Sequence, residues 1–594
     1  MRYSALVVLM GMTASLAHGQ QSTINWAPLT YTSAAGDSVA ADSGRVTVLE
    51  NRARPNGAKI EIAVVRFRST AARPGAPIIY LAGGPGAAGI AGGRGDLYPT
   101  IQALRSVSDV ILFDQRGTGF TLPSLVVRST FGIPLTMSTA SPEALTALVS
   151  RSKQAAAEVK ARGIDLASYN TVENAHDLDD IRKALGANKV IIWGHSYGSH
   201  LGLAYIRFHE KSVERAMLGG INGLDQRRRY PADADILFRR IDSVVKATPR
   251  LRAVMPDFLA TSRRAFARME AQPGRAMVDS QEVVVSKEDA QAVIAVMSGE
   301  QSIVRRLPWI MARLEAGDYS WMARQVRDVI KNRPIGTTMT YVMDLASGVS
   351  AERSTRIRSQ VATAILGNSI NYPFDNPEFQ SVWEVKDLGP QFRAPVRSSI
   401  PALFISGTLD GRTSLGDAEE VRRGFRNGAH VVVSGASHNP YAVTPELMRL
   451  MLRFASGGRV RDTTLIAPNV ELRGPDEAQI IDELRAIALK DGGNAAATKL
   501  REYSRDGSGK YVSSFVVSGL FQALATQARD AAIAVLRAGL ELFPANSFLL
   551  TRLAEAETVL GNKPAAIDAY RKAVAADPFN QGAAVQLRRL TKTE

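Results

Sequence analysis

The sequence predicts an α/β fold in which a mostly parallel β-sheet is divided by a helical insertion and followed by an all-α extension. Short apolar runs end in glycine-containing loops and alternate with helical stretches, whereas helical periodicity dominates residues 226–397 and returns beyond residue 457. Short buried strands that alternate with helices are typical of parallel sheets, because each crossover helix covers a face of the sheet. We therefore expect residues 20–225 and 398–457 to build one sheet, with residues 226–397 as a cap.

Each strand of the expected sheet has its own signal. Two alternating apolar segments between Arg45 and Ser69 flank a Pro-Asn-Gly turn and predict a β-hairpin. Short, largely apolar runs predict buried strands at residues 76–81, 109–113, 190–193, 215–218, 400–406 and 429–433. Apolar residues between Ala175 and Leu185 recur at the spacing of an amphipathic helix, which leads into the strand at 190–193.

The segment from Lys189 to Tyr205, KVIIWGHSYGSHLGLAY, carries a motif with chemical meaning. Its apolar run, its Gly-His-Ser-Tyr-Gly turn and its helical pattern predict a strand, a sharp turn and a helix. Such a nucleophile elbow holds Ser196 in a strained backbone conformation and exposes its hydroxyl, while glycines 194 and 198 let strand and helix pass close together. Ser196 is therefore the candidate nucleophile.

A serine nucleophile needs a base, and the base needs a carboxylate that fixes its tautomer. Of the seven histidines, only His438 follows a sheet strand in a loop from which its side chain can reach over the strand ends. The others lie in the N-terminal segment, on helices, in the elbow turn or at the start of a strand: His18, His176, His195, His200, His209 and His430. His438 is therefore the candidate base.

The carboxylate is expected after the nucleophile and before the histidine, which is the order of triads that use this elbow. The strand at 400–406 runs into Gly-Thr-Leu-Asp-Gly, which makes Asp410 the candidate acid. Asp417 competes with it. However, Asp417 stands three residues after Ser414 at a predicted helix start, which gives it a capping role instead.

The oxyanion that forms on attack needs two backbone donors. The amide of Tyr197, directly after the nucleophile, is one candidate. The second is expected in the glycine loop after residues 76–81, where Gly84 is the candidate because Pro85 has no amide proton. No lysine follows this loop at P-loop spacing, which argues against phosphate binding.

Taken together, these motifs resemble the proline iminopeptidase and tripeptidyl aminopeptidase family of α/β-hydrolase serine peptidases. The motifs are GGPG at 83–86, DQRGTG at 114–119, GHSYG at 194–198, GTLDG at 407–411 and GASH at 435–438. The resemblance covers about residues 40–225 and 395–455. It implies an α/β-hydrolase fold, a triad of Ser196, Asp410 and His438, and an oxyanion hole that includes the GGPG loop.

The same resemblance implies roles for four further acidic or basic residues. Asp114 and Arg116 of the DQRG segment would support the structure. Carboxylates near the cap would hold the free ammonium of a peptide substrate, and Asp344 and Glu352 are the candidates. The sequence departs from the family in two ways: Ala82 stands where the glycine loop often begins with histidine, and the chain lacks the cysteine pairs that exported relatives often carry near the cap.

Composition excludes several classes of function. The formal charge of +15 comes from 72 Lys and Arg against 57 Asp and Glu, spread without a dense basic run that interleaves with aromatic residues. This pattern argues against nucleic-acid binding and indicates a solvated basic surface. The absence of cysteine excludes a cysteine nucleophile, disulfides and a thiolate metal site. The triad chemistry itself needs neither a cofactor nor a metal.

Residues 1–19 predict a secretory signal peptide, with one basic residue, an apolar run from Ala5 to Ala17 and small residues at its end. The run of 13 residues is shorter than the roughly 20 that span a bilayer. We expect an exported protein, periplasmic or secreted, without stable membrane insertion.

The chain is expected to end in a helical linker, residues 458–510, and tetratricopeptide-like repeats, residues 511–594. Equivalent positions recur 34 residues apart in the pairs Ala532 and Ala566, Leu536 and Tyr570, and Pro544 and Pro578. Because about three repeats are needed for independent stability, we expect this tail to pack on the main body. It either binds a protein or peptide partner or extends the structure.

These observations lead to three hypotheses. The first is an exported serine aminopeptidase that removes one or a few residues from the N-termini of peptides. The second keeps the triad but acts on carboxylic esters or other amides, because the elbow does not distinguish these substrates. The third is a tetratricopeptide-type adaptor with a non-catalytic hydrolase body. Dehalogenase and epoxide hydrolase chemistry is disfavoured, because it needs an aspartate in place of Ser196.

Overall fold

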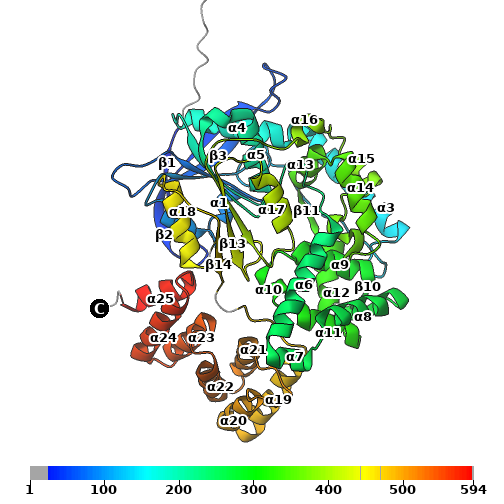
Figure 1. Cartoon of the computed structure of the whole chain (residues 1–594), viewed down its shortest axis with the longest axis vertical. Coiled ribbons are helices and arrows are strands. Elements are labelled where there is room, and N and C mark those ends of the chain that lie inside the picture. The colour runs from blue at the N-terminus through cyan, green and yellow to red at the C-terminus, as the bar shows by residue number, and fades with distance from the viewer. Residues whose placement is uncertain (1–23, 442, 468–469, 592–594) are drawn as a thin grey trace, which may run out of the picture.

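A ten-stranded β-sheet lies at the centre of the computed structural model, which describes residues 24–441, 443–467 and 470–591 (Figure 1). The predicted signal peptide, residues 1–19, lies outside the described residues, so export stays a prediction. Within the described ranges, no helix is both long and apolar enough to cross a membrane.

The sheet has the strand order β1-β2-β3-β5-β4-β7-β8-β12-β13-β14, antiparallel from β1 to the β3–β5 pairing and parallel from β5 to β14. The antiparallel strands are β1 (Ala27–Thr32), β2 (Ser38–Leu49) and β3 (Lys59–Phe67). The parallel strands are β4 (Ile78–Leu81), β5 (Val110–Phe113), β7 (Val190–His195), β8 (Val213–Gly219), β12 (Ala402–Gly407), β13 (Gly428–Ser434) and β14 (Thr463–Ile466). The α/β fold with its mostly parallel sheet is confirmed. Strands β1 and β14, most of whose residues are exposed or partly exposed, have no apolar run that would predict them.

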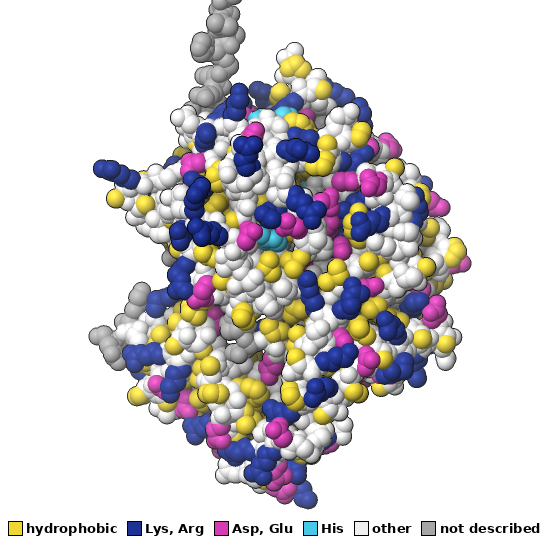
Figure 2. Space-filling model, viewed as in Figure 1, with side chains coloured by type: hydrophobic (Ala, Val, Ile, Leu, Met, Phe, Trp, Pro, Cys, Tyr) yellow, Lys and Arg dark blue, Asp and Glu magenta, His cyan; other side chains and the backbone are white. Residues whose placement is uncertain are grey.

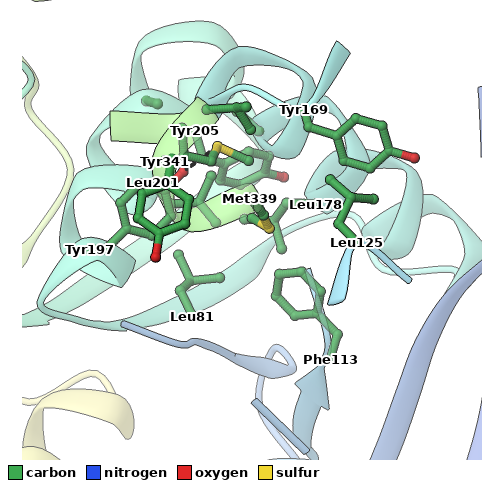
Figure 3. Packing of buried hydrophobic residues seen from close by; sticks show 14 of the residues in the cluster. Leu81, Phe113, Leu125, Tyr169, Leu178, Tyr197, Leu201, Tyr205, Met339 and Tyr341 are labelled. Carbon is green, nitrogen blue, oxygen red and sulfur yellow. Dashed lines mark hydrogen bonds between the residues drawn. The ribbon is translucent and has the colours of Figure 1, made fainter. Parts of the chain in front are cut away.

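Alternate residues of the central strands enter two different cores. In β4, Ile79 and Leu81 face the same core as Tyr197 and Leu201, whereas Ile78 and Tyr80 face the opposite one. Figure 3 shows Leu81 among the aromatic rings of the first core. Because both faces are buried, these strands lack a polar side and appear as continuous apolar runs.

Helices of the main body cover both faces (Figure 1). The first core includes residues of α3 (Pro142–Ala161), α4 (Thr171–Ala184), α5 (Tyr197–His209) and α17 (Leu415–Arg422), and the second includes residues of α1 (Gly89–Gly92), α2 (Tyr98–Leu104) and α18 (Pro445–Ala455). Helix α4 begins four residues before the predicted Ala175, because Asn170 accepts hydrogen bonds from the amides of Val172 and Glu173 and caps the helix there.

Helices dominate the inserted segment, as expected, and much of it forms a core of its own around Phe238, Val293 and Met311. Its helices are α6 (Pro231–Ala247), α7 (Pro249–Val254), α8 (Phe258–Ala271), α9 (Lys287–Met297), α10 (Gln301–Val304), α11 (Leu307–Ala316), α12 (Ser320–Gln325), the π-helix Val326–Lys331, α13 (Met339–Ser347), α14 (Ala351–Gln360), α15 (Pro377–Ser381) and α16 (Gly389–Arg393). A hairpin of β9 (Gly274–Val278) and β10 (Gln281–Val285) interrupts them.

One part of the insertion belongs to the main body rather than to the cap core. Strand β11 (Pro334–Thr337) pairs with β6 (Val126–Thr130), and α13, which follows it, places Met339 and Tyr341 in the first core. Figure 3 shows both side chains close to Tyr197 and Leu201. The insertion is therefore anchored beside the elbow helix α5.

The C-terminal helices keep the predicted 34-residue spacing. They are α19 (Glu477–Asp491), α20 (Gly493–Tyr503), α21 (Ser514–Leu524), α22 (Arg529–Leu542), α23 (Ser547–Val559), α24 (Lys563–Ala576) and α25 (Gln581–Thr591). Helices α22 and α24 are offset by 34 positions, as are α23 and α25, and Ala532 and Ala566 are both fully buried. The tetratricopeptide assignment and a partner for the tail remain predictions.

The tail packs on the main body, as its small number of repeats led us to expect. Arg588 forms an ion pair with Asp37, and Gln581 Nε2 donates a hydrogen bond of 3.2 Å to the carbonyl of Gly95. Tyr511 joins the core of the cap.

Figure 2 shows basic side chains spread over one face of the molecule and interspersed with acidic ones, which fits a solvated basic surface.

Replacing Gly198 with alanine should destabilise the protein strongly, because a Cβ atom at this position would lie 1.8 Å from the carbonyl oxygen of Leu81. That neighbour is backbone in a central strand and cannot move aside, so we expect a loss of more than about 3 kcal/mol. The midpoint of thermal unfolding should fall by about 6 °C or more, or soluble protein should be lost. Gly92→Ala is the matched control, since nothing lies within 4 Å of its added Cβ; equal effects of both changes would contradict the prediction.

Candidate active site

Ser196 lies between β7 and α5 in the backbone conformation predicted for an elbow, with φ of 56° and ψ of −122°. This region of positive φ is unfavourable for any residue with a side chain, so the surrounding packing must impose it. An added Cβ on Gly194 would lie 2.5 Å from the carbonyl oxygen of Gly198, which shows how closely strand and helix pass. The glycines therefore permit the strain at Ser196.

The predicted acid and base are in contact. Nδ1 of His438 lies 2.7 Å from Oδ2 of Asp410, and both side chains are buried. Asp410 also accepts hydrogen bonds from the amide of Arg412 at 2.7 Å and from the hydroxyl of Thr413 at 2.6 Å. Burial by itself raises the pKa of Asp410, but the charge of His438 and these hydrogen bonds outweigh it and lower that pKa to about 2. The carboxylate is thus ionised at neutral pH.

The competing carboxylate, Asp417, is engaged elsewhere. Its backbone amide donates a hydrogen bond of 3.0 Å to the hydroxyl of Ser414, which caps α17, and its carboxylate forms an ion pair of 3.0 Å with Arg353. Both contacts support α17 and its packing against α14. The geometry therefore favours Asp410 over Asp417 as the partner of His438.

His438 also differs from the other histidines that the structure describes. It alone among them lies within hydrogen-bond distance of a carboxylate. Burial, as the largest cause, lowers the pKa of both His195 and His200 to about 3. His176 and His209 contact each other, with 2.9 Å between Nδ1 and Nε2.

The second ring nitrogen of His438 is free to act on the elbow. Nε2 is buried and has no hydrogen-bond partner among the described residues. The ring of His195, the neighbour of Ser196, lies 4.8 Å from the His438 ring between centroids. No hydrogen bond joins Ser196 to His438 in the described part of the chain, and such bonds are often long before a substrate binds.

The glycine loop after β4 borders the nucleophile, as predicted. An added Cβ on Gly83 would lie 3.1 Å from Cβ and 3.8 Å from Oγ of Ser196, which shows how closely this loop approaches the nucleophile. Gly84 follows with φ of 108°. Tyr197 opens α5, where the backbone amides of the first helical turn have no partner within the helix. The donor roles of Gly84 and Tyr197 remain predictions that this arrangement allows.

The DQRG segment has the structural contacts that the resemblance implied. Arg116 is fully buried and forms two hydrogen bonds with the carboxylate of Asp177, at 2.7 and 2.8 Å. Asp114 accepts hydrogen bonds from the amides of Ile90 and Phe120 at 2.9 and 2.8 Å. These contacts tie the loop after β5 to α1 and α4.

A cavity of about 280 Å³ opens in front of Ser196 and is lined by Gly84 and Pro85 on one side. Asp344, the first candidate for ammonium binding, lines this cavity, but its carboxylate forms an ion pair with Arg227. Glu352, the second candidate, is exposed in the first turn of α14 and is not part of the lining. The structure brings only Asp344 to the nucleophile.

Sequence reasoning missed the basic residues of this cavity. Arg227, Arg228 and Arg229 lie in the connection between β8 and α6 and line the cavity together. Their place in the sequence could have indicated this role. Ligands of parallel α/β sheets bind beyond the carboxyl ends of the strands, and these three arginines come after the carboxyl end of a predicted strand. We had attributed the arginines of the chain to its solvated surface.

Two family models match parts of the chain. Residues 76–247 match the family described as alpha/beta hydrolase fold, and residues 376–453 match the family described as TAP-like protein. The first match spans β4, β5, β7 and β8 together with the elbow. The second includes β12, β13 and the loops that carry Asp410 and His438.

The chain is also similar to three kinds of curated protein. Serine protease Hip1 of Mycobacterium tuberculosis (strain CDC 1551 / Oshkosh) is 28% identical over 183 residues, 30% of this chain and 35% of that protein. Tripeptidyl aminopeptidase of Streptomyces coelicolor is 33% identical over 195 residues, 30% of this chain and 34% of that protein. Proline iminopeptidase of Neisseria gonorrhoeae is 27% identical over 161 residues, 27% of this chain and 37% of that protein.

The matches span about a third of the length of these curated relatives. These sequence matches, the family models, the strand order and the strained backbone of Ser196 all indicate the same architecture. The chain therefore has the α/β-hydrolase fold, and its residues 376–453 are similar to the TAP-like family.

Proposed function

We propose that the chain is a serine peptidase that releases one or a few residues from the N-termini of peptides. The observation that supports this most is the buried contact between His438 and Asp410, with the free Nε2 of His438 beside the elbow of Ser196. The relatives named tripeptidyl aminopeptidase and proline iminopeptidase support the choice of peptides as substrates.

The proposed mechanism is acyl transfer. Neutral His438 takes the proton of Ser196 as its oxygen attacks the scissile carbonyl, and the amides of Tyr197 and Gly84 stabilise the oxyanion. Ionised Asp410 then stabilises the imidazolium, which protonates the leaving amine. Water hydrolyses the acyl-enzyme in a second attack that uses His438 again as the base.

A second candidate function has support from the cavity. Its single lining carboxylate, Asp344, is already paired with Arg227, so a substrate ammonium would have to compete with a guanidinium. A carboxylic ester, or an amide without a free amine, would need no such partner. The same triad serves both kinds of substrate.

Ser196→Ala should abolish hydrolysis of short peptidyl amides, with kcat lower by roughly 10⁶-fold, because the nucleophile is removed. A fluorophosphonate should label the unmodified protein on the peptide that contains Ser196. Ser243→Ala, at an exposed serine of α6 whose hydroxyl donates to the carbonyl of Arg239, serves as a check that hydroxyl loss elsewhere does not remove the label. Hydrolysis that survives Ser196→Ala would refute the proposed nucleophile.

Asp410→Asn should lower kcat by roughly 10³–10⁴-fold while the fold is kept, because an amide cannot stabilise the imidazolium of His438. Asp417→Asn is the matched control, since Asp417 pairs with Arg353 rather than with His438. Steady-state kinetics on one peptidyl amide compares the two variants. If Asp417→Asn caused the larger loss of kcat, the acid would be assigned wrongly.

Acetylation of the N-terminal amine of a good peptide substrate should lower kcat/KM by about tenfold or more, because a charge-assisted contact is lost. Paired assays of the free and acetylated substrate measure this directly. Unchanged kcat/KM would discard ammonium recognition and favour the ester or amide hydrolase instead.

A further inference from the structure

The cavity in front of Ser196 is strongly cationic. Its lining contains one carboxylate, Asp344, and five arginines: Arg227, Arg228, Arg229, Arg333 and Arg412. Two of these charges have acidic partners, because Arg227 pairs with Asp344 and Arg412 lies 3.2 Å from Glu300. The other three form no ion pair with any described residue.

Arg228 and Arg229 are the unusual members of this set. Arg228 is 7% exposed and stacks over the ring of Phe374, 4.8 Å from its centroid, without a hydrogen-bond acceptor for its guanidinium in the described chain. Nη1 of Arg229 is buried and has no hydrogen-bond partner there either. Burial, as the largest cause, lowers the pKa of each guanidinium to about 10, so both stay charged at neutral pH.

Arg228 is buried, Arg229 is partly buried with its Nη1 fully enclosed, and neither guanidinium has a hydrogen-bond acceptor in the described chain. Such placement is costly, because much of the solvation of the charge is lost without a direct replacement from the protein. Asp344 and Asp375 act on Arg228, and Asp410 and Asp344 act on Arg229, only through their more distant charges. No ion pair joins any of these carboxylates to Arg228 or Arg229. An anion that enters the cavity would supply the missing acceptors. The planar guanidinium fork matches a carboxylate best, through two parallel hydrogen bonds.

Arg228 and Arg229 lie where a bound anion would be close to the proposed nucleophile. Ser196 and Gly84 line the same cavity, and the charge of Arg229 acts on Asp410. A volume of about 280 Å³ accommodates one side chain or a short acyl group rather than a long peptide. Phe374 and Ile370 add apolar surface for a methylene stem.

We propose that the substrate carries a carboxylate close to its scissile carbonyl, and that Arg228 and Arg229 bind it. This inference rests on the proposed serine hydrolase and names the chemistry of its substrate. The carboxylate belongs either to an acidic side chain, such as glutamate, or to a dicarboxylic acyl group, such as succinyl. Both sources share the same anion, and neither changes the acyl-transfer step.

Two pairs of p-nitroanilide substrates of equal size test the proposal. Glutamyl p-nitroanilide is compared with glutaminyl p-nitroanilide, and succinyl p-nitroanilide, whose own carbonyl is the scissile one, with succinamoyl p-nitroanilide. The two members of each pair are of equal size and differ in charge. The unmodified protein should prefer the acid in at least one pair by about tenfold or more in kcat/KM. Preference in the first pair assigns a side-chain carboxylate, and preference in the second pair assigns an acyl carboxylate.

Arg228→Gln and Arg229→Gln should each bring this preference close to unity, because kcat/KM falls more for the acid than for its neutral partner. The rate of fluorophosphonate labelling of Ser196 shows that each variant keeps its active site. Arg358→Gln, an exposed arginine of α14 that donates to Ser354 and Thr355, is the matched control and should keep the preference.

Equal turnover of acid and neutral partner in both pairs by the unmodified protein would overturn the proposal, whether or not the arginine variants fold. This failure is distinct from failure of the proposed function. In the first case fluorophosphonate still labels Ser196 and neutral substrates are hydrolysed, whereas in the second case Ser196→Ala retains activity.

Discussion

The close passage of α5 across the ends of β4 and β7 is the constraint on which the site depends. Gly198 lies so near Leu81, and Gly194 so near Gly198, that a side chain at either position would overlap backbone atoms. This packing holds Ser196 at positive φ, where its hydroxyl stands clear of strand and helix. The strain at one residue is thus supported by two buried cores, one on each face of the sheet.

Around this fixed point, buried charges fall into two classes. Some are fully paired: Arg116 with Asp177 holds the loop after β5, and His438 with Asp410 forms the proposed base and acid. Arg228 and Arg229 are not paired, and they face the cavity that contains the nucleophile. Paired charges fix the framework, whereas unpaired buried charges indicate where a ligand completes the structure.

The insertion contributes to the site through both of its parts. Strand β11 and helix α13 anchor it in the first core, next to Tyr197, and Asp344 reaches the cavity from α13. Ile370 and Phe374, farther along the insertion, form the apolar side of the same cavity. The cavity in front of Ser196 is therefore lined by segments that are distant in sequence from the elbow. Proteins with the same elbow can act on different substrates, because such segments vary independently of it.

The α/β architecture, the elbow of Ser196 and the contact of Asp410 with His438 could be predicted from the sequence. Each follows from local signals, namely apolar runs, glycine turns and the order of motifs along the chain. Prediction from the sequence failed for residues whose environment depends on which distant segments pack together. Asp344 forms an ion pair with Arg227 rather than having a free carboxylate, and Glu352 is exposed at the surface. Arg228 and Arg229 looked like solvated charges. The environment of these four residues is visible only in the tertiary structure, because the burial and pairing of a charge depend on neighbours more than a hundred residues away.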